Sequence, residues 1–133
     1  MASVFSRILS GELPGQIVWQ DEDFAALLDI NPINPGHVLL VPKLEIESIF
    51  EWPAPLYQRA WEIVRWLEPV LRRVTGAPKL GVAVEGFGVA HAHIHLVPVF
   101  AGNQLDPNRA KAASQSELSQ MRLQIMRELG INT

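Results

Sequence analysis

The chain has 133 residues, of which 48% are apolar, and it contains no cysteine. This length suits one domain with a substantial core, and the lack of cysteine excludes disulfide frameworks and thiolate metal sites. The formal net charge of −3, without a basic cluster, argues against a long nucleic acid as partner, because such binding needs a cationic face. The sequence shows no apolar run typical of a signal peptide or a membrane span, so we expect a cytoplasmic protein that binds no membrane.

The first part of the chain predicts one short helix and three strands. Residues 3–10 place apolar side chains at helical spacing. Residues 16–20 and 24–30 predict two strands joined by a hairpin turn, and residues 37–42 predict a third strand that is apolar on both faces. The two prolines and the glycine of residues 31–36 exclude regular structure there.

The second part predicts a long helix, two more strands and a terminal helix. The expected elements are a short helix (44–50), a long amphipathic helix (56–74), two strands (79–86 and 91–100) and a last helix (117–129). Pro69 is expected to kink or interrupt the long helix. Because the strands largely follow one another, the pattern favours an α+β fold with an antiparallel sheet. We expect a single domain over 1–133, with its core at about 3–100 and a C-terminal linker and helix at 101–133.

Three of the four histidines stand at alternate positions, His91, His93 and His95, inside the last expected strand. Alternate side chains of a strand share one face, so the three imidazoles should lie together. The intervening residues, which should face the core, are Ala92, Ile94 and Leu96. A neutral imidazole is a good nucleophile at pH 7, and a neighbouring imidazole can donate to a phosphate oxygen or a leaving group. The pattern therefore favours phosphate chemistry.

Two other interpretations of the histidines stay open. An H-x-H pair can share a metal ion, with Glu85 or His37 as a further ligand, although the outer two of three histidines lie about 13 Å apart along a straight strand. The histidines could also simply face solvent or bond to the backbone. Gly86 and Gly88, just before the strand, argue against this last interpretation because glycine lets the backbone approach a ligand closely.

The stretch HAHIHLV, residues 91–97, matches the H-φ-H-φ-H-φ-φ signature of the histidine triad (HIT) family, in which φ is apolar. Residues 5–43 resemble the N-terminal half of that family, including an E-φ-P turn and the run DINPINPGHVLLVPK. The resemblance covers about residues 3–100. It implies a HIT-like α+β fold, with a five-stranded antiparallel sheet, a long central helix and a C-terminal helix, in a homodimer.

The resemblance also implies an activity. Family members act at the α-phosphate of nucleoside phosphoramidates or dinucleoside polyphosphates and release a nucleoside monophosphate, and the expected substrate is a purine nucleotide. By resemblance His93 is the nucleophile that forms a covalent nucleotidyl-histidine, and His95 contacts the phosphate and helps to protonate the leaving group. His91 would fix the geometry, and His37 matches a further histidine near the phosphate. No metal or other cofactor is expected.

Asp29 matches the family's ribose-binding carboxylate, although an aspartate before Asn31-Pro32 is equally explained as a turn residue. The other nucleotide-binding residues that the resemblance implies are Phe5, Ile8, Leu13, Leu27 and Ile30 in the base pocket, with Gly88 and Val89 before the triad. Each apolar residue of the base pocket is also explained by ordinary core packing.

The sequence departs from the family at two places. Ser3 and Ser6 stand where many members have the Cys-x-x-Cys of a zinc site, so we expect that zinc site to be absent. Phe87 and Gly88 stand where many members have a glutamine and a hydroxyl residue, which puts the substrate preference in question. His95 favours hydrolysis over transfer. The alternatives are a nucleotide-binding regulatory module with little turnover and a small metal-dependent protein.

Overall fold

A computed structural model describes residues 2–131 of the chain; residue 1 and residues 132–133 of the expected domain lie outside the described residues. Its core is a five-stranded sheet in the order β1-β2-β3-β5-β4, in which every neighbouring pair is antiparallel. The strands are β1 (Ile17–Gln20), β2 (Phe24–Leu28), β3 (Val38–Pro42), β4 (Lys79–Ala83) and β5 (Ile94–Val99). The expected α+β fold with an antiparallel sheet is confirmed.

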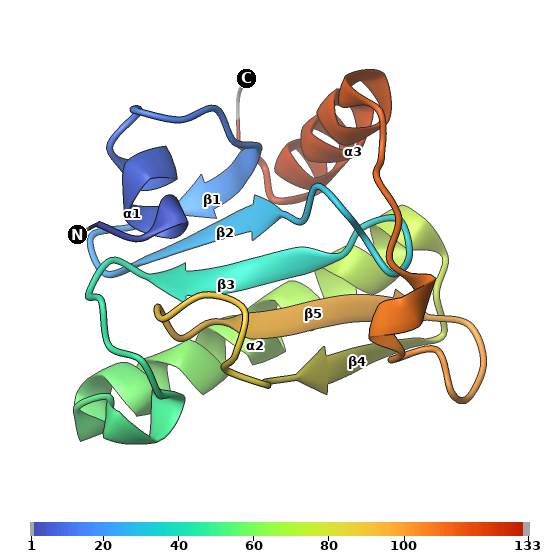
Figure 1. The fold of residues 1–133 in the computed structure, drawn as a ribbon. Helices are drawn as coiled ribbons and strands as arrows, with labels where there is room; N and C mark the ends of the chain where they lie inside the picture. Colours follow the sequence, from blue (N-terminus) through green and yellow to red (C-terminus); the bar gives the residue numbers. More distant parts are fainter. Residues whose placement is uncertain (1, 132–133) are drawn as a thin grey trace.

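Helices cover both faces of this sheet (Figure 1). The helices are α1 (Val4–Leu9), α2 (Ala54–Thr75) and α3 (Gln115–Glu128), with the 3-10 turns η1 (Ile49–Glu51) and η2 (Pro107–Arg109). The long helix α2 runs behind the sheet, α3 packs against α2 and β1, and α1 lies on the opposite face. Among residues 2–131, no helix is both long and apolar enough to cross a membrane.

Two apolar clusters explain why β2 and β3 are buried along their whole length. The larger cluster, between the sheet and helices α2 and α3, includes Phe24, Leu40 and Ile94. The smaller cluster lies under α1 and is built from Phe5, Leu27, Leu39 and Val41. The sheet face under α1 therefore carries the smaller apolar cluster, and it is the face on which His37, just before β3, and His95, in β5, lie.

The histidine strand begins later than predicted, at Ile94 rather than at residue 91. Strand β3 ends at Pro42, which has no N–H to offer to a ladder. The carbonyl of Pro42 instead accepts from the ring of His91, and the Ala92 N–H bonds to the carbonyl of Ile46. The predicted inward orientation is confirmed, since the core side chains include Ala92, Ile94 and Leu96.

Two helix predictions differ from the structure. Residues 44–50 form no α-helix and reach only the turn η1, because the Ile46 carbonyl and the Glu45 carboxylate bond to distant segments. The long helix is neither interrupted nor ended at Pro69: α2 continues for 22 residues through it. A proline removes one helical N–H bond, and burial of the neighbouring Leu67 and Leu71 offsets that loss.

Candidate active site

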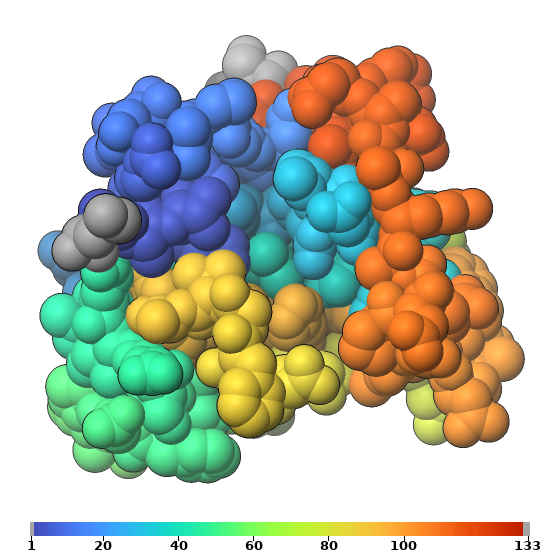
Figure 2. All heavy atoms as spheres, viewed as in Figure 1, coloured from blue at the N-terminus to red at the C-terminus, as the bar shows by residue number. Residues whose placement is uncertain are grey.

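The four histidines gather beside a cleft on the α1 side of the sheet. Figure 2 shows this hollow between the yellow loop of residues 84–90 and the orange linker of residues 101–112. The cleft has a volume of about 230 Å³, and its lining includes Asp29, His37 and His95. A second cleft, of about 280 Å³, is lined by His93 and Phe50. Glu85 lines both clefts, so they adjoin at the loop before the triad.

His93 presents a free ring nitrogen. Its Nδ1 lies 2.8 Å from the carbonyl oxygen of His91, and because a carbonyl only accepts, Nδ1 carries the proton and donates it. In the neutral ring, Nε2 is therefore left with its lone pair. Burial lowers the pKa of His93 below the ordinary value of 6.5 and outweighs the opposite effect of the bond to His91. The neutral, nucleophilic form is thus favoured at pH 7.

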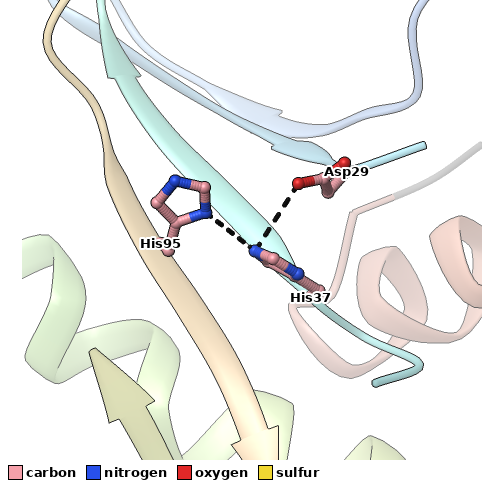
Figure 3. Close-up of side chains that lie close together, drawn as sticks. All are labelled: Asp29, His37 and His95. Carbon is pink, nitrogen blue, oxygen red and sulfur yellow. Dashed lines mark hydrogen bonds and ion pairs between the residues drawn. The ribbon is translucent and has the colours of Figure 1, made fainter. Parts of the chain in front are cut away.

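His37 and His95 form a directed pair across strands β3 and β5 (Figure 3). The backbone N–H of Ile33 donates to Nδ1 of His37 at 3.0 Å, so the proton of neutral His37 sits on Nε2. That Nε2 lies 2.9 Å from Nδ1 of His95 and donates to it. The proton of His95 is then on its own Nε2. His95 therefore offers a hydrogen-bond donor where His93 offers an acceptor.

Burial sets the charge of this pair. His37 is only 2% exposed, and burial lowers its pKa to about 4, although the Asp29 carboxylate acts in the opposite direction. The pKa of His95 is also lowered, chiefly by burial and then by the charge of His93. Gly36 places His37 here: its φ of +88° and the 2.6 Å that would separate a Cβ from Thr75 Cγ2 both exclude a side chain.

Asp29 is shared between a turn and the site. Its Oδ1 accepts from the N–H of Asn31 at 2.8 Å, which is the turn that the sequence allowed. Its Oδ2 lies 3.6 Å from Nε2 of His37 and faces that ring in Figure 3. One carboxylate oxygen thus remains at the cleft, where it could accept from a diol. The ribose contact itself stays a prediction.

His91 differs from the other triad members because it is fully buried. Its Nε2 donates to the Pro42 carbonyl at 2.7 Å, and its Nδ1 lies 2.5 Å from the Ser3 hydroxyl. Glu45 completes the group, since one of its carboxylate oxygens accepts from the Ser3 N–H and the Ser6 hydroxyl. These two bonds, that of Ser6 first, lower the pKa of Glu45 to about 2.

Sequence reasoning missed Glu45. Its bonding partners are 42 and 39 residues away along the chain. In the sequence, Ser3 and Ser6 stood out as the residues that replace a cysteine pair, and no polar cluster was predicted there. Nothing local to Glu45 distinguishes it from the neighbouring Glu47, which is exposed.

The residues expected at the base pocket are only partly brought together. Phe5 and Leu27 belong to the smaller apolar cluster, and Ile8 and Val89 pack against it. The ring of Phe5 meets that of His93 edge-on, with centroids 4.8 Å apart. Three expected residues lie outside this cluster: Leu13 is half-buried, Ile30 is 58% exposed and Gly88 is exposed. Phe87, which replaces the usual glutamine, is 90% exposed and makes no such contact.

Asp29, His37 and His95 are residue types that bind metals, and their donor atoms lie within 4.8 Å of one another. The hydrogen bonds oppose this use. A metal-bound histidine usually donates its other N–H to an acceptor. The other nitrogen of His37 accepts from Ile33, which places the proton on the very Nε2 that would have to bind the ion. The group fits a hydrogen-bonded relay better than a metal site.

Comparison with known proteins gives the family context. The model of the HIT domain matches residues 10–102. An uncharacterized HIT-like protein of Methanocaldococcus jannaschii is 34% identical over 110 residues, which cover 75% of this chain and 81% of that protein. An adenylylsulfatase of Arabidopsis thaliana, HINT3, is 29% identical over 100 residues, which cover 71% of this chain and 51% of that protein.

Solved structures show the same fold. A hypothetical histidine triad nucleotide-binding protein from Sulfolobus tokodaii superposes with a TM-score of 0.85 at 24% identity, covering 95% of this chain and 91% of that chain. A zinc-bound histidine triad family protein from Mycobacterium smegmatis superposes with a TM-score of 0.83, also at 24% identity, covering 98% of this chain and 94% of that chain.

Proposed function

The chain belongs to the HIT family, and from that premise we propose that it is a nucleotide hydrolase that attacks the α-phosphate of its substrate with His93. The substrates are nucleoside phosphoramidates or dinucleoside polyphosphates, and the product is a nucleoside monophosphate. The observation that carries the proposal is the free Nε2 of His93, whose lone pair is set by the bond from Nδ1 to the His91 carbonyl. The adenylylsulfatase among the relatives supports hydrolysis of a nucleotide in general terms.

The reaction has two steps. In the first, the lone pair of His93 Nε2 forms a bond to the α-phosphorus while the bond to the leaving group breaks and its electron pair departs with that group. The Nε2–H of His95 hydrogen-bonds to the leaving atom and stabilises the charge that develops there, and the leaving group takes its proton from solvent. In the second step, water attacks the phosphorus, the bond to His93 breaks with its electron pair returning to Nε2, and the water's proton passes to solvent. The sum is addition of one water across one P–N or P–O bond.

The surrounding residues would hold the nucleotide. Asp29 keeps one carboxylate oxygen at the cleft for the ribose hydroxyls. The apolar residues around α1, led by Phe5, would contact the base, and we favour a purine because the family resemblance implies it. His37 would hold the proton of His95 on the nitrogen that faces the substrate.

Release of AMP from adenosine 5′-phosphoramidate and from diadenosine polyphosphates, without added metal, tests this function. Wild type should release AMP, and His93→Ala should lower the rate at least about a thousandfold while still binding AMP, because the nucleophile is lost but the pocket is kept. Near wild-type turnover by the variant would show that His93 is not the nucleophile.

A regulatory nucleotide-binding module is the second candidate. It is favoured by Phe87 and Gly88, which offer no side-chain polar group where the family has a glutamine and a hydroxyl. The side chain of Phe87 is 90% exposed. The same assay separates the two functions, since AMP binding without release from any substrate would support the module and overturn the hydrolase.

We also propose a homodimer, as the family resemblance implies. Helix α2 carries Trp66, which is 46% exposed, and this half-buried aromatic surface suits a protein interface. Sedimentation equilibrium should give twice the chain mass of 14.8 kDa. A mass equal to that of one chain at micromolar concentration would contradict the dimer.

A further inference from the structure

His91, the buried histidine outside the reacting pair, belongs to a hydrogen-bonded polar cluster. We call this cluster the clip, and its members are Ser3, Ser6, Glu45 and His91. Three separate segments supply it, namely the start of α1, the segment after β3 and the segment before β5. Glu45 accepts from the Ser3 N–H at 2.5 Å and from the Ser6 hydroxyl at 2.6 Å. The Ser3 hydroxyl bonds Nδ1 of His91 at 2.5 Å. The proposed reaction uses none of these side chains directly.

The directions of these bonds are consistent with one another. The Pro42 carbonyl can only accept, so Nε2 of His91 carries a proton and donates it. In the neutral ring Nδ1 is then an acceptor, and it takes the proton of the Ser3 hydroxyl. That hydroxyl in turn accepts from the Ser6 N–H at 3.1 Å as the cap of α1. The ring of His91 is thus held at both nitrogens.

The clip reaches the nucleophile through the backbone. The carbonyl of His91 is the acceptor that holds Nδ1 of His93, so a shift of His91 moves or frees the His93 ring. Residues 91–93 precede β5 and lie outside its pairing with β3 and β4. The N–H of Ala92 bonds instead to the carbonyl of Ile46. Phe5, on the helix that the clip fastens, packs edge-on against both His91 and His93, with centroids 5.6 and 4.8 Å away.

We propose that Glu45 and Ser3 are positioning residues that fix His91 and thereby aim Nε2 of His93 at the substrate phosphorus. This inference rests on the proposed hydrolase function for its kinetic test. Glu45 touches neither of the reacting histidines, and its effect passes through the serines and His91. Small displacements of a reacting group cost much in rate, because attack needs near-linear geometry, so loss of the clip should lower kcat more than it changes substrate binding.

The experiment compares Glu45→Ala, Glu45→Gln and the matched control Glu47→Ala, with phosphoramidate turnover as readout. Glu45→Ala should lower kcat about tenfold or more with KM within about twofold, because the nucleotide pocket is intact but the nucleophile is misaimed. Glu45→Gln keeps an amide oxygen that can accept from both serines, so it should retain most of the rate. Glu47 is exposed and outside the clip, and its loss should leave kcat unchanged.

A second readout separates positioning from stability. Nitrogen-15 NMR of the imidazoles reports which ring nitrogen carries the proton, and in Glu45→Ala the His93 ring should lose its single tautomer. An unchanged kcat and an unchanged His93 spectrum, with only a lower melting temperature, would overturn the proposal. Equal losses of kcat in Glu45→Gln and Glu45→Ala would overturn it as well, since the effect would then come from charge alone.

The same spectrum keeps the test independent of the proposed function. If wild type hydrolyses no substrate, the hydrolase proposal fails, and the tautomer of His93 in Glu45→Ala still decides the positioning role in either direction. If Glu45→Ala does not fold, Ser6→Ala, which removes one of the two donors to Glu45, replaces it in both measurements. A wild-type His93 spectrum and kcat in that variant would overturn the proposal.

Discussion

His95 and His91 stand four residues apart, yet the protein holds them by different means. His95 lies in β5, between β3 and β4, where backbone pairing with Leu39 and Ala83 fixes its direction. His91 lies before the strand and is held by the Ser3 hydroxyl, at the start of α1, and by the backbone carbonyl of Pro42, the last residue of β3. One short sequence motif is therefore positioned in two ways. The sheet region, in which β3 and β5 bring His37 and His95 together, holds one end, the clip holds the other, and His93 lies between them.

A fall in pH should remove the stabilisation first of the sheet region around His37 and His95 and then of the clip. This is the largest effect that we expect. The folded pKa of His37, about 4, lies below its ordinary 6.5, so the unfolded chain binds the proton first and stability is lost as the pH falls from 6.5. The loss should reach roughly 3 kcal/mol of unfolding free energy by pH 4. The pKa shifts of His93 and His95 act in the same direction.

The stabilisation that the clip provides should be lost only at lower pH. The folded pKa of Glu45, about 2, lies below its ordinary 4.5, so its contribution is complete above 4.5 and is lost as the pH falls toward 2. Urea unfolding between pH 7 and pH 3 measures both stages. His37→Asn should flatten the upper stage and Glu45→Gln the lower. An upper stage that persists unchanged in His37→Asn would show that the sheet region does not control it.

A single substitution can remove the hydrogen bond between His37 and His95 from the sheet region. His37→Asn keeps an oxygen to accept from Ile33 but loses the donor to His95, so His95 can take its other tautomer and no longer offers its Nε2 proton. We expect kcat to fall about a hundredfold. His37→Gln, whose amide nitrogen can reach the Nε2 position, should lose less. Equal kcat in wild type and His37→Asn would remove His37 from the proposed relay.

Asp29 lies at the edge of the sheet region, and its loss should have the smallest effect. Asp29→Ala removes the proposed acceptor for the ribose, so kcat/KM for ribonucleotides should fall about tenfold. The corresponding 2′-deoxynucleotides lack one donor and should lose less. An equal loss for both would assign Asp29 to the turn with Asn31 rather than to the ribose.

The sequence predicted the sheet region better than the clip. Alternation of apolar residues from Ala92 to Leu96 correctly gave the inward face, and the buried run of residues 37–42 correctly gave a strand covered on both sides. These patterns are local, and burial of a periodic face dictates them. The family resemblance, not the residue patterns, supplied the roles of the histidines.

The sequence-based predictions fail where contacts with residues distant in the sequence determine the local structure. The strand was extended back to His91 because alternation continues there, whereas the pairing of β3 with β5 stops at Leu40 and Ile94. The helix expected at 44–50 fails because its polar groups bond to α1 and to Ala92. Pro69 was expected to kink or interrupt α2, but the helix is not interrupted there, because tertiary burial outweighs the lost bond. Local propensity yields to tertiary contacts at each of these places.

The pairing of Leu39 with His95 has a consequence for folding fidelity. A slip of one residue between β3 and β5 would put Ile94 or Leu96 opposite Leu39 and would turn the imidazole of His95 into the apolar core. His37 would then lack its partner, and two aliphatic side chains would face the cleft. A molecule with this shifted register therefore lacks the site altogether and should be inactive. The specific activity of a refolded sample should then be proportional to the fraction of molecules with the correct register. Misfolding during refolding should lower that fraction and leave the kcat of the active molecules unchanged.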